Sequence, residues 1–363
     1  MECLREESRS VKIRIKESTN KKQKPDENNL GFGSIFTDHM FIMDYEEGKG
    51  WFDPRIVPYG PFEVSPSMSV FHYGQAVFEG LKAYRSPEGK VLLFRPMENM
   101  KRLNKSNKRM CIPEIDSEFC LKAIKELVKL EEDWVPSVEG TSLYIRPFII
   151  STGTTLKLKP SASYRFMVIL SPVGAYYPQG INPVDIYVET EYVRAVPGGT
   201  GFAKTNGNYA GSMKAQAEAA EKGFVQVLWL DGIERKYVEE VGSMNVFFKI
   251  DEEIITPVLQ GSVLPGITRD SAIDVMKSWG LKVSERKISI EEVYKAHNDG
   301  ILEESFGTGT AAVISPVGAL NWQGNDIRIN GGKTGDIAKK LYNTITGIQT
   351  GKLEDKFGWT VEV

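Results

Sequence analysis

The sequence predicts two domains of mixed α and β structure. Its 363 residues are too many for one ordinary hydrophobic core, and 41% hydrophobic with 26% charged residues is typical of a folded protein. Strand-like and helix-like stretches occur in both halves, and turn formers gather between them. We therefore expect an N-terminal α/β domain over residues 1–177, a linker over 178–189 and a C-terminal α/β domain over 190–363.

In the first half, residues 11–16 alternate apolar and basic side chains, which predicts a short edge strand. Pro96 suits the first position of a helix, and Asp116 or Ser117 can cap a second helix that continues to Leu130. Further strands are expected at residues 36–43, 75–84, 91–94, 143–151 and 165–170, with a turn at 86–89.

The turn formers of residues 177–183, which include Pro178, Gly180 and Pro183, indicate the linker. Beyond them, Ser289 and Glu292 form a capping box for a helix, and Asp231-Gly232 favours a hairpin turn. The other elements expected in this half are helices at 212–222, 270–279 and 336–348 and strands at 225–230, 245–250 and 311–316.

Composition argues against several classes of protein. A net charge of −3 gives no reason to expect a nucleic-acid partner, and no apolar run reaches the ~18 residues that a membrane span needs. The N-terminal segment has no apolar signal core, so we expect a cytoplasmic protein. No metal site is expected, because the few cysteines and histidines show no metal-ligand spacing. They are Cys3, Cys111, Cys120, His39, His72 and His297.

The densest glycine cluster surrounds one lysine, Lys204, in residues 197–209 (PGGTGFAKTNGNY). Glycines let the backbone bend sharply, and a lysine held in an apolar enclosure can keep a free amine that condenses with an aldehyde. An arbitrary lysine is far more often solvated. A phosphate-binding P-loop is disfavoured, because Ala203 stands where that motif needs the glycine before Lys204. The second candidate, Gly332-Lys333-Thr334, is disfavoured because Ile327 stands at the position of the first glycine.

Residues 201–211 (GFAKTNGNYAG) and 239–245 (EEVGSMN) together resemble the class IV pyridoxal-phosphate enzymes, which have the D-amino-acid-aminotransferase-like fold, fold type IV. Five more segments narrow the resemblance to branched-chain aminotransferases, and it extends from about Phe32 to the C-terminus. These segments are 36–40 (FTDHM), 72–84 (HYGQAVFEGLKAY), 143–147 (LYIRP), 264–269 (LPGITR) and 306–311 (FGTGTA).

The resemblance implies that Lys204 carries pyridoxal 5′-phosphate and moves the substrate proton. Glu240 matches the carboxylate that keeps the pyridine nitrogen protonated, which makes the ring a better electron sink. Glu239 competes for that role, but the VGSMN context favours Glu240. Tyr209 matches the partner of the phenolic oxygen. Arg102, Ile267, Thr268 and Thr310 match the phosphate site, where a helix beginning near Arg269 would offer free N–H groups.

Substrate contacts follow from the same resemblance. Ser243, Thr310 and Ala311 match positions that bind the α-carboxylate of the substrate. Arg146 is expected to bind the second carboxylate of glutamate. Leu156 and Leu158 match a segment that reaches into the partner subunit's pocket, which implies a homodimer. The aromatic lining is expected from Phe32, Tyr73, Phe78, Tyr144 and Tyr176.

The expected reaction is reversible transfer of the amino group of L-leucine, L-isoleucine or L-valine to 2-oxoglutarate. Two alternatives remain open: another class IV activity, on D-amino acids or aminodeoxychorismate, and a phosphate-binding module without catalysis. The chain also differs from animal members at one point. Their redox-active Cys-x-x-Cys pair is replaced here by Ala312 and Ser315, so no thiol switch is expected.

Overall fold

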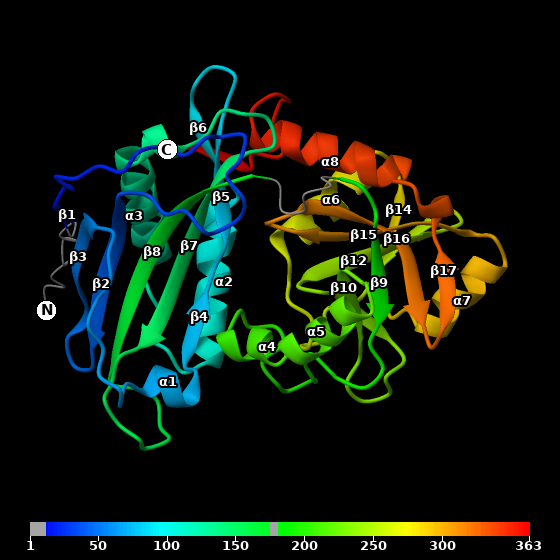
Figure 1. Cartoon of the computed structure of the whole chain (residues 1–363), viewed down its shortest axis with the longest axis horizontal. Helices are drawn as coiled ribbons and strands as arrows, with labels where there is room; N and C mark the ends of the chain where they lie inside the picture. Colours follow the sequence, from blue (N-terminus) through cyan, green and yellow to red (C-terminus); the bar gives the residue numbers. More distant parts are fainter. Residues whose placement is uncertain (1–11, 175–180) are drawn as a thin grey trace, which may run out of the picture.

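The computed structural model describes residues 12–174 and 181–363. In this part of the chain two lobes stand side by side, and each is built on a nine-stranded sheet (Figure 1). Helix α2 lies on the side of the first lobe that faces the second, and helices α4 and α5 lie on the second lobe (Figure 1).

The first sheet has the strand order β1-β3-β2-β8-β7-β5-β6-β18, and β4 pairs with β7. Its strands are β1 (Arg14–Ile15), β2 (His39–Glu46), β3 (Gly50–Pro58), β4 (Ala76–Phe78), β5 (Leu81–Arg85), β6 (Val91–Phe94), β7 (Ser142–Ser151), β8 (Ser163–Val173) and β18 (Thr360–Glu362). The helices of this lobe are α1 (Ser69–Tyr73), α2 (Pro96–Arg109), α3 (Ser117–Leu130) and the 3₁₀ turn η1 (Glu132–Trp134).

The second sheet has the order β11-β10-β9-β16-β15-β12-β13-β14, and β17 pairs with β16. Its strands are β9 (Val184–Val188), β10 (Gln226–Leu230), β11 (Val238–Val241), β12 (Met244–Ile250), β13 (Glu253–Thr256), β14 (Lys282–Glu285), β15 (Leu302–Gly309), β16 (Val313–Trp322) and β17 (Asn325–Arg328). The helical segments are α4 (Asn206–Ala210), α5 (Met213–Glu221), α6 (Ile267–Ser278), α7 (Ile290–Asn298), α8 (Asp336–Gln349) and the 3₁₀ turn η2 (Asn330–Gly332).

Separate apolar cores fill the two lobes, and a third core joins them. Leu103 of α2 and Ile124 of α3 pack on the first sheet, whereas Phe248 lies in the core of the second. In the third core, Phe94 of β6 packs in one cluster with Phe247 of β12 and residues of α6 and α8. This shared core fixes the two sheets relative to each other, so residues from both lobes can form one rigid site.

Most helix boundaries agree with the sequence prediction. Pro96 is the first residue of α2, and the Asp116 carboxylate accepts the N–H groups of Glu118 and Phe119 at the start of α3. The Ser289 hydroxyl accepts the N–H of Glu292 at the start of α7. Local capping chemistry therefore positioned these helices correctly.

Two of the predicted domain boundaries are wrong. The expected linker, 178–189, is too long, because Val184–Val188 form β9 inside the second sheet, with alternate side chains buried. The last residues do not stay with the C-terminal domain, because β18 pairs with β6 in the first sheet. Residues 178–180 of the expected linker, Tyr176 and Val11 of the expected first strand lie outside the described residues.

Smaller differences concern turns. The strand expected over 75–84 is interrupted at Glu79-Gly80 and forms β4 and β5. The hairpin turn expected at Asp231-Gly232 extends to Tyr237, because the Asp231 carboxylate accepts several backbone N–H groups of that loop. Helix α6 begins at Ile267, two to three residues before the start expected near Arg269 or Asp270, so Thr268 belongs to its first turn.

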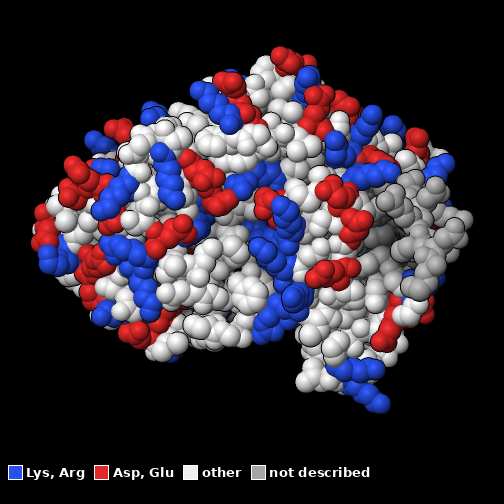
Figure 2. Space-filling model, turned by 180° about the vertical axis from the view of Figure 1, so that it is seen from behind, with Lys and Arg blue, Asp and Glu red and all other residues white. Residues whose placement is uncertain are grey.

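Charged side chains of both signs cover the face of the molecule that Figure 2 shows, and Lys and Arg side chains gather where the two lobes meet. Among the described residues, no helix is both long and apolar enough to cross a membrane.

Candidate active site

Lys204 lies in a loop of the second lobe that is hydrogen-bonded to the first. Its backbone N–H donates to the Ser106 hydroxyl of α2 at 2.9 Å, and its carbonyl accepts the Phe78 N–H of β4 at 3.0 Å. The buried Thr205 hydroxyl donates to the Ala76 carbonyl at 2.7 Å. These contacts hold the lysine at the junction between the two lobes, whose relative position is fixed by the third core.

The glycines predicted to bend this loop have a steric role at Gly201. A Cβ atom there would lie 2.1 Å from the Ser262 carbonyl oxygen, which no real side chain tolerates. Asn208 then closes the bend, because its amide donates to the carbonyls of Thr200 and Ala203, both at 2.8 Å. The loop can thus approach the 262–264 segment closely while presenting Lys204.

The amine of Lys204 points at an aromatic pair. Its Nζ donates to the Tyr209 hydroxyl at 2.8 Å and lies 4.8 Å from the centroid of the Phe78 ring. The rings of Phe78 and Tyr209 are themselves 4.8 Å apart. Among the described residues the amine has a phenol as its hydrogen-bond partner and no carboxylate within ion-pair distance, which suits a nucleophilic amine.

Glu240 is buried on β11. Its Oε1 accepts the Leu264 N–H at 2.7 Å, and its Oε2 lies 3.1 Å from Nε of Arg194. Burial raises the pKa of Glu240, although Arg194 and the Leu264 N–H favour its charged form. A cavity lined by Tyr209, Glu240 and Ser243 opens beside it, so the carboxylate belongs to the same site as Lys204.

Three of the four residues predicted to bind phosphate lie around a second, small cavity. Ile267, Thr268 and Thr310 line it together with Lys82. The first hydrogen bond of α6 is donated by Asp270 to Gly266, so the N–H groups of the preceding residues in its first turn are free within the helix. Free N–H groups at a helix start, with the helix dipole behind them, are suited to an anion.

Arg102 reaches this region from α2, paired with Glu79. The guanidinium donates to both oxygens of Glu79 at 2.8 Å and to the Pro265 carbonyl at 3.0 Å. Burial alone would raise the pKa of Glu79, but the Arg102 guanidinium lowers it below its usual range. Glu79 therefore fixes the rotamer of Arg102 beside the turn that precedes α6.

Arg146 lies among the aromatic residues predicted to line the substrate pocket. Its Nη2 donates to the Tyr144 hydroxyl at 2.9 Å, and its guanidinium carbon lies 4.6 Å from the centroid of Phe78. Phe32 packs edge-on against Tyr144 with centroids 5.3 Å apart. Among the described residues Arg146 forms no ion pair, and its buried Nε has no hydrogen-bond partner. Gly80 leaves room for this cluster, because a Cβ there would meet the Tyr144 hydroxyl at 2.1 Å.

Not every predicted residue joins this cluster. Tyr73 lies on α1, is 39% exposed and donates its hydroxyl to the Leu156 carbonyl. Leu156 and Leu158 are 67% and 82% exposed. Ser243 lies beside Glu240, whereas Ala311 is next to Thr310 and its carbonyl accepts Nζ of Lys82 at 2.7 Å. Tyr176 lies outside the described residues.

Three contacts in the site were not predicted from sequence. Glu79 pairs with Arg102, Arg194 pairs with Glu240, and Lys82 reaches the Ala311 carbonyl from the other lobe. Burial lowers the pKa of Lys82 to about 8. Glu79 and Lys82 lie inside the segment 72–84 that matched the family, which was the available signal, whereas nothing in the sequence around Arg194 marks it.

The chain is similar to known aminotransferases over most of its length. The family model described as "Amino-transferase class IV" matches residues 76–320. Branched-chain-amino-acid aminotransferase 2 of Bacillus subtilis is 64% identical, with 97% of each chain covered. A branched-chain amino acid aminotransferase structure from Escherichia coli has a TM-score of 0.71 and 30% identity over 89% of this chain and 98% of that one.

A branched-chain amino acid aminotransferase from T.th., solved with pyridoxamine 5′-phosphate, has a TM-score of 0.71 and 29% identity over 88% of this chain and 97% of that one. The chain belongs to the class IV aminotransferases, and it has their fold type IV architecture. It is therefore an aminotransferase that depends on pyridoxal 5′-phosphate.

The residues present fit that cofactor. An amine for its aldehyde (Lys204), a phenol (Tyr209), a buried carboxylate (Glu240) and the free N–H groups of α6 all surround the junction of the lobes. On β15, which ends one residue before Thr310, the hydroxyl of Thr308 is also buried and has no hydrogen-bond partner among the described residues. Each chemical group of the cofactor thus has a complementary group of the chain.

Proposed function

We propose that the protein transfers the amino group of L-leucine, L-isoleucine or L-valine to 2-oxoglutarate, giving the branched 2-oxo acid and L-glutamate. The observation that carries the proposal is a cluster of aromatic side chains beside Lys204 that surrounds one arginine, Arg146, which has no ion-pair partner among the described residues. Phe32, Phe78 and Tyr144 suit an aliphatic side chain, and Arg146 suits a carboxylate. The names of the B. subtilis and E. coli relatives support it.

The role that we propose for each residue of the site follows from its contacts. Lys204 would hold the cofactor through its amine and later move a proton at the substrate α-carbon. Tyr209, whose hydroxyl accepts a hydrogen bond from that amine, would bind the phenolic oxygen of the cofactor. Glu240 holds a proton at the pyridine nitrogen, while Ile267, Thr268, Thr310 and Arg102 hold the phosphate. When bound, pyridoxal phosphate supplies the electron sink for the reaction. Ser243 and the Thr310-Ala311 backbone would receive the α-carboxylate.

Arg146→Leu should impair the reaction with glutamate and 2-oxoglutarate more than the reaction with leucine. We expect kcat/KM for glutamate and 2-oxoglutarate to fall by ~10- to 100-fold, the ~1.5–3 kcal/mol of one hydrogen bond to a charged group, because their second carboxylate loses its partner. The leucine half-reaction should change much less. Single-turnover absorbance of the cofactor measures each half-reaction separately.

Arg109→Leu is a suitable control for that experiment, because Arg109 donates to the carbonyls of Gly198 and Gly199 outside the aromatic pocket. It should not discriminate between leucine and glutamate. Equal losses for both substrates in Arg146→Leu would make Arg146 a structural residue and leave glutamate recognition unexplained.

We also propose a cytoplasmic homodimer. Tyr73, Leu156 and Leu158 are exposed and close together, since the Tyr73 hydroxyl bonds the Leu156 carbonyl. Exposed apolar side chains that cluster in this way are typical of interaction surfaces. In a dimer they could complete the aromatic lining of the partner subunit's pocket. Light scattering of the purified protein tests the assembly, and a monomeric, fully active enzyme would refute it.

Activity should survive mild oxidation. Ala312 and Ser315 supply no thiol beside the Thr310-Ala311 turn, and burial raises the pKa of the Cys120 thiol, which keeps it protonated and unreactive. We expect unchanged turnover after peroxide treatment that leaves methionine intact. A loss of turnover that dithiothreitol restores would contradict this expectation and would direct attention to the exposed Cys111.

A further inference from the structure

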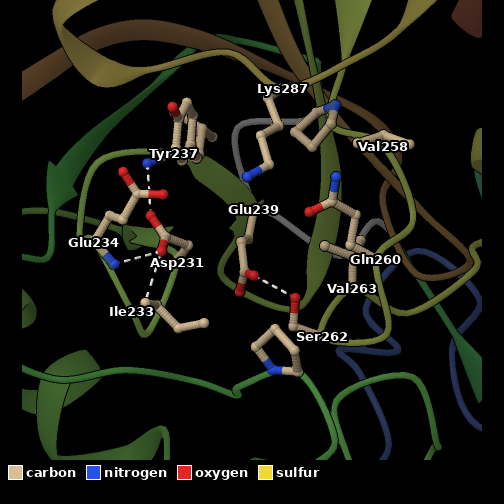
Figure 3. Close-up of a pocket in the computed structure, with 13 residues that line it drawn as sticks. Asp231, Ile233, Glu234, Tyr237, Glu239, Val258, Gln260, Ser262, Val263 and Lys287 are labelled. Atoms are coloured by element: carbon tan, nitrogen blue, oxygen red, sulfur yellow. Dashed lines mark hydrogen bonds between the residues drawn. The ribbon is translucent and has the colours of Figure 1, made fainter.

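The glutamate that precedes Glu240 is also buried. Glu239 is 6% exposed, and the two residues are consecutive on β11, so their side chains leave the strand on opposite faces. Glu240 faces the proposed cofactor, whereas Glu239 faces a separate pocket, where Gln260, Ser262 and Lys287 surround it (Figure 3). The sequence analysis considered Glu239 only as an alternative to Glu240 for the carboxylate at the pyridine nitrogen.

Both carboxylates hold the same short segment, Ser262 to Leu264. The Ser262 hydroxyl donates to Oε1 of Glu239 from one side, as the dashed line in Figure 3 shows. The Leu264 N–H donates to Oε1 of Glu240 at 2.7 Å from the other. Arg194 connects the two, because its Nη2 donates to the Ser262 carbonyl and its Nε lies 3.1 Å from Oε2 of Glu240.

This segment leads directly into the phosphate region. Pro265 follows Leu264, and its carbonyl accepts Nη1 of Arg102 at 3.0 Å. The Leu264 carbonyl accepts the Asn245 amide at 2.9 Å. Gly266 and the first turn of α6 come next. A displacement of Ser262 would therefore change the contacts of both Glu240 and the phosphate site.

We propose that Glu239 is a positioning residue, which through its hydrogen bond with Ser262 fixes the 262–264 segment and so holds Arg194 and the Leu264 N–H against Glu240. This inference rests on the proposed role of Glu240 at the pyridine nitrogen. Glu239 itself touches neither cofactor nor substrate. It acts through Ser262, from the face of β11 opposite to the active site.

A purely structural role fits the surroundings of Glu239 less well. Its Oε2 is buried and has no hydrogen-bond partner among the described residues. Burial also raises the pKa of this carboxyl, although the Ser262 hydroxyl and Arg194 oppose the change. If stability were its only function, its removal should lower the melting temperature and leave the active site intact, yet a half-satisfied buried carboxyl contributes little stability. The positioning role predicts instead that the active site is impaired.

The test compares the holoenzymes of Glu239→Ala, Glu239→Gln, Ser262→Ala and the double variant Glu239→Ala/Ser262→Ala. We expect kcat for leucine to fall roughly tenfold in each alanine variant, with KM nearly unchanged, which is the effect of one lost hydrogen bond to a charged group. The double variant should be no worse than either single one, because both remove the same contact. Glu239→Gln should keep most of the activity, since its amide oxygen can still accept the Ser262 hydroxyl.

Two readouts do not depend on turnover. The absorption spectrum of the bound cofactor should shift in both alanine variants and not in Glu239→Gln, and the dissociation constant of pyridoxal phosphate should rise. If Glu239→Ala does not fold, Ser262→Ala alone must show the same spectrum, kcat and cofactor affinity. Wild-type values in Ser262→Ala, or additive losses in the double variant, would overturn the inference.

Glu240→Gln, measured in parallel, separates this inference from the proposed function. If Glu240→Gln is fully active, the role of Glu240 itself is wrong. If Glu240→Gln is impaired while the alanine variants of Glu239 and Ser262 match wild type, only the positioning inference fails.

Discussion

Lys204→Ala is expected to abolish turnover while the protein still binds pyridoxal phosphate. Lys204 is the lysine whose amine lies between Tyr209 and Phe78, and the variant removes both the covalent attachment and the base that moves the substrate proton. General acid–base catalysis alone contributes ~10²–10⁴-fold, so we expect a loss of at least ~10³-fold. The free N–H groups of α6 and Arg102 remain, and phosphate binding should persist.

The measurement combines turnover with borohydride reduction, which fixes the cofactor to the wild-type chain and should fail to fix it to the variant. Lys214→Ala is the matched control, because Lys214 lies on the exposed side of α5 and pairs with Glu218. It should match wild type in both assays. Turnover near the wild-type rate in Lys204→Ala would show that another group carries the cofactor.

Glu240→Gln should slow the reaction by ~10²- to 10³-fold with the fold intact, the usual effect of removing one preorganised electrostatic partner. The amide oxygen can still accept one of the two donors that the carboxylate contacts, the Leu264 N–H or the Arg194 guanidinium, but the amide cannot hold a proton at the pyridine nitrogen. Glu240→Ala is a poorer test, because it would leave the buried Arg194 guanidinium without its partner, which typically costs ~3–5 kcal/mol.

A primary deuterium isotope effect with α-deuterated leucine checks the reason for the loss. It should increase in Glu240→Gln, because removal of the α-proton becomes more strongly rate-limiting. An unchanged rate, or a slower rate without any change in isotope effect, would show that Glu240 does not assist removal of the α-proton.

The sequence predicted local features better than boundaries between domains. Capping residues such as Asp116 and Ser289 set helix ends through neighbours three residues away, so they can be recognised without the tertiary structure. In contrast, β9 follows Asn182-Pro183 so closely that it appeared to be part of the linker. The return of β18 to β6 depends on pairing across more than half of the chain, which no local pattern indicates.

In the candidate site, too, local motifs could be predicted from the sequence and tertiary contacts could not. Lys204, Tyr209 and Glu240 lie in segments that resemble the family, and the structure brings them to one junction between the lobes. Arg194 could not be predicted, because its role depends only on tertiary contacts with Glu240 and Ser262. The burial of Glu239 was missed for the same reason, since alternation along β11 predicts one buried face and this strand is buried on both.

Transamination of branched-chain amino acids can be followed through the absorbance of the bound cofactor. The purified holoenzyme would be mixed in single turnovers with L-leucine, L-isoleucine, L-valine, D-alanine or aminodeoxychorismate, and then with 2-oxoglutarate. We expect the three branched L-amino acids to convert the cofactor from its aldehyde to its amine form, and 2-oxoglutarate to restore it with formation of L-glutamate. Conversion by D-alanine, or turnover of aminodeoxychorismate, with no response to L-leucine would contradict the claim.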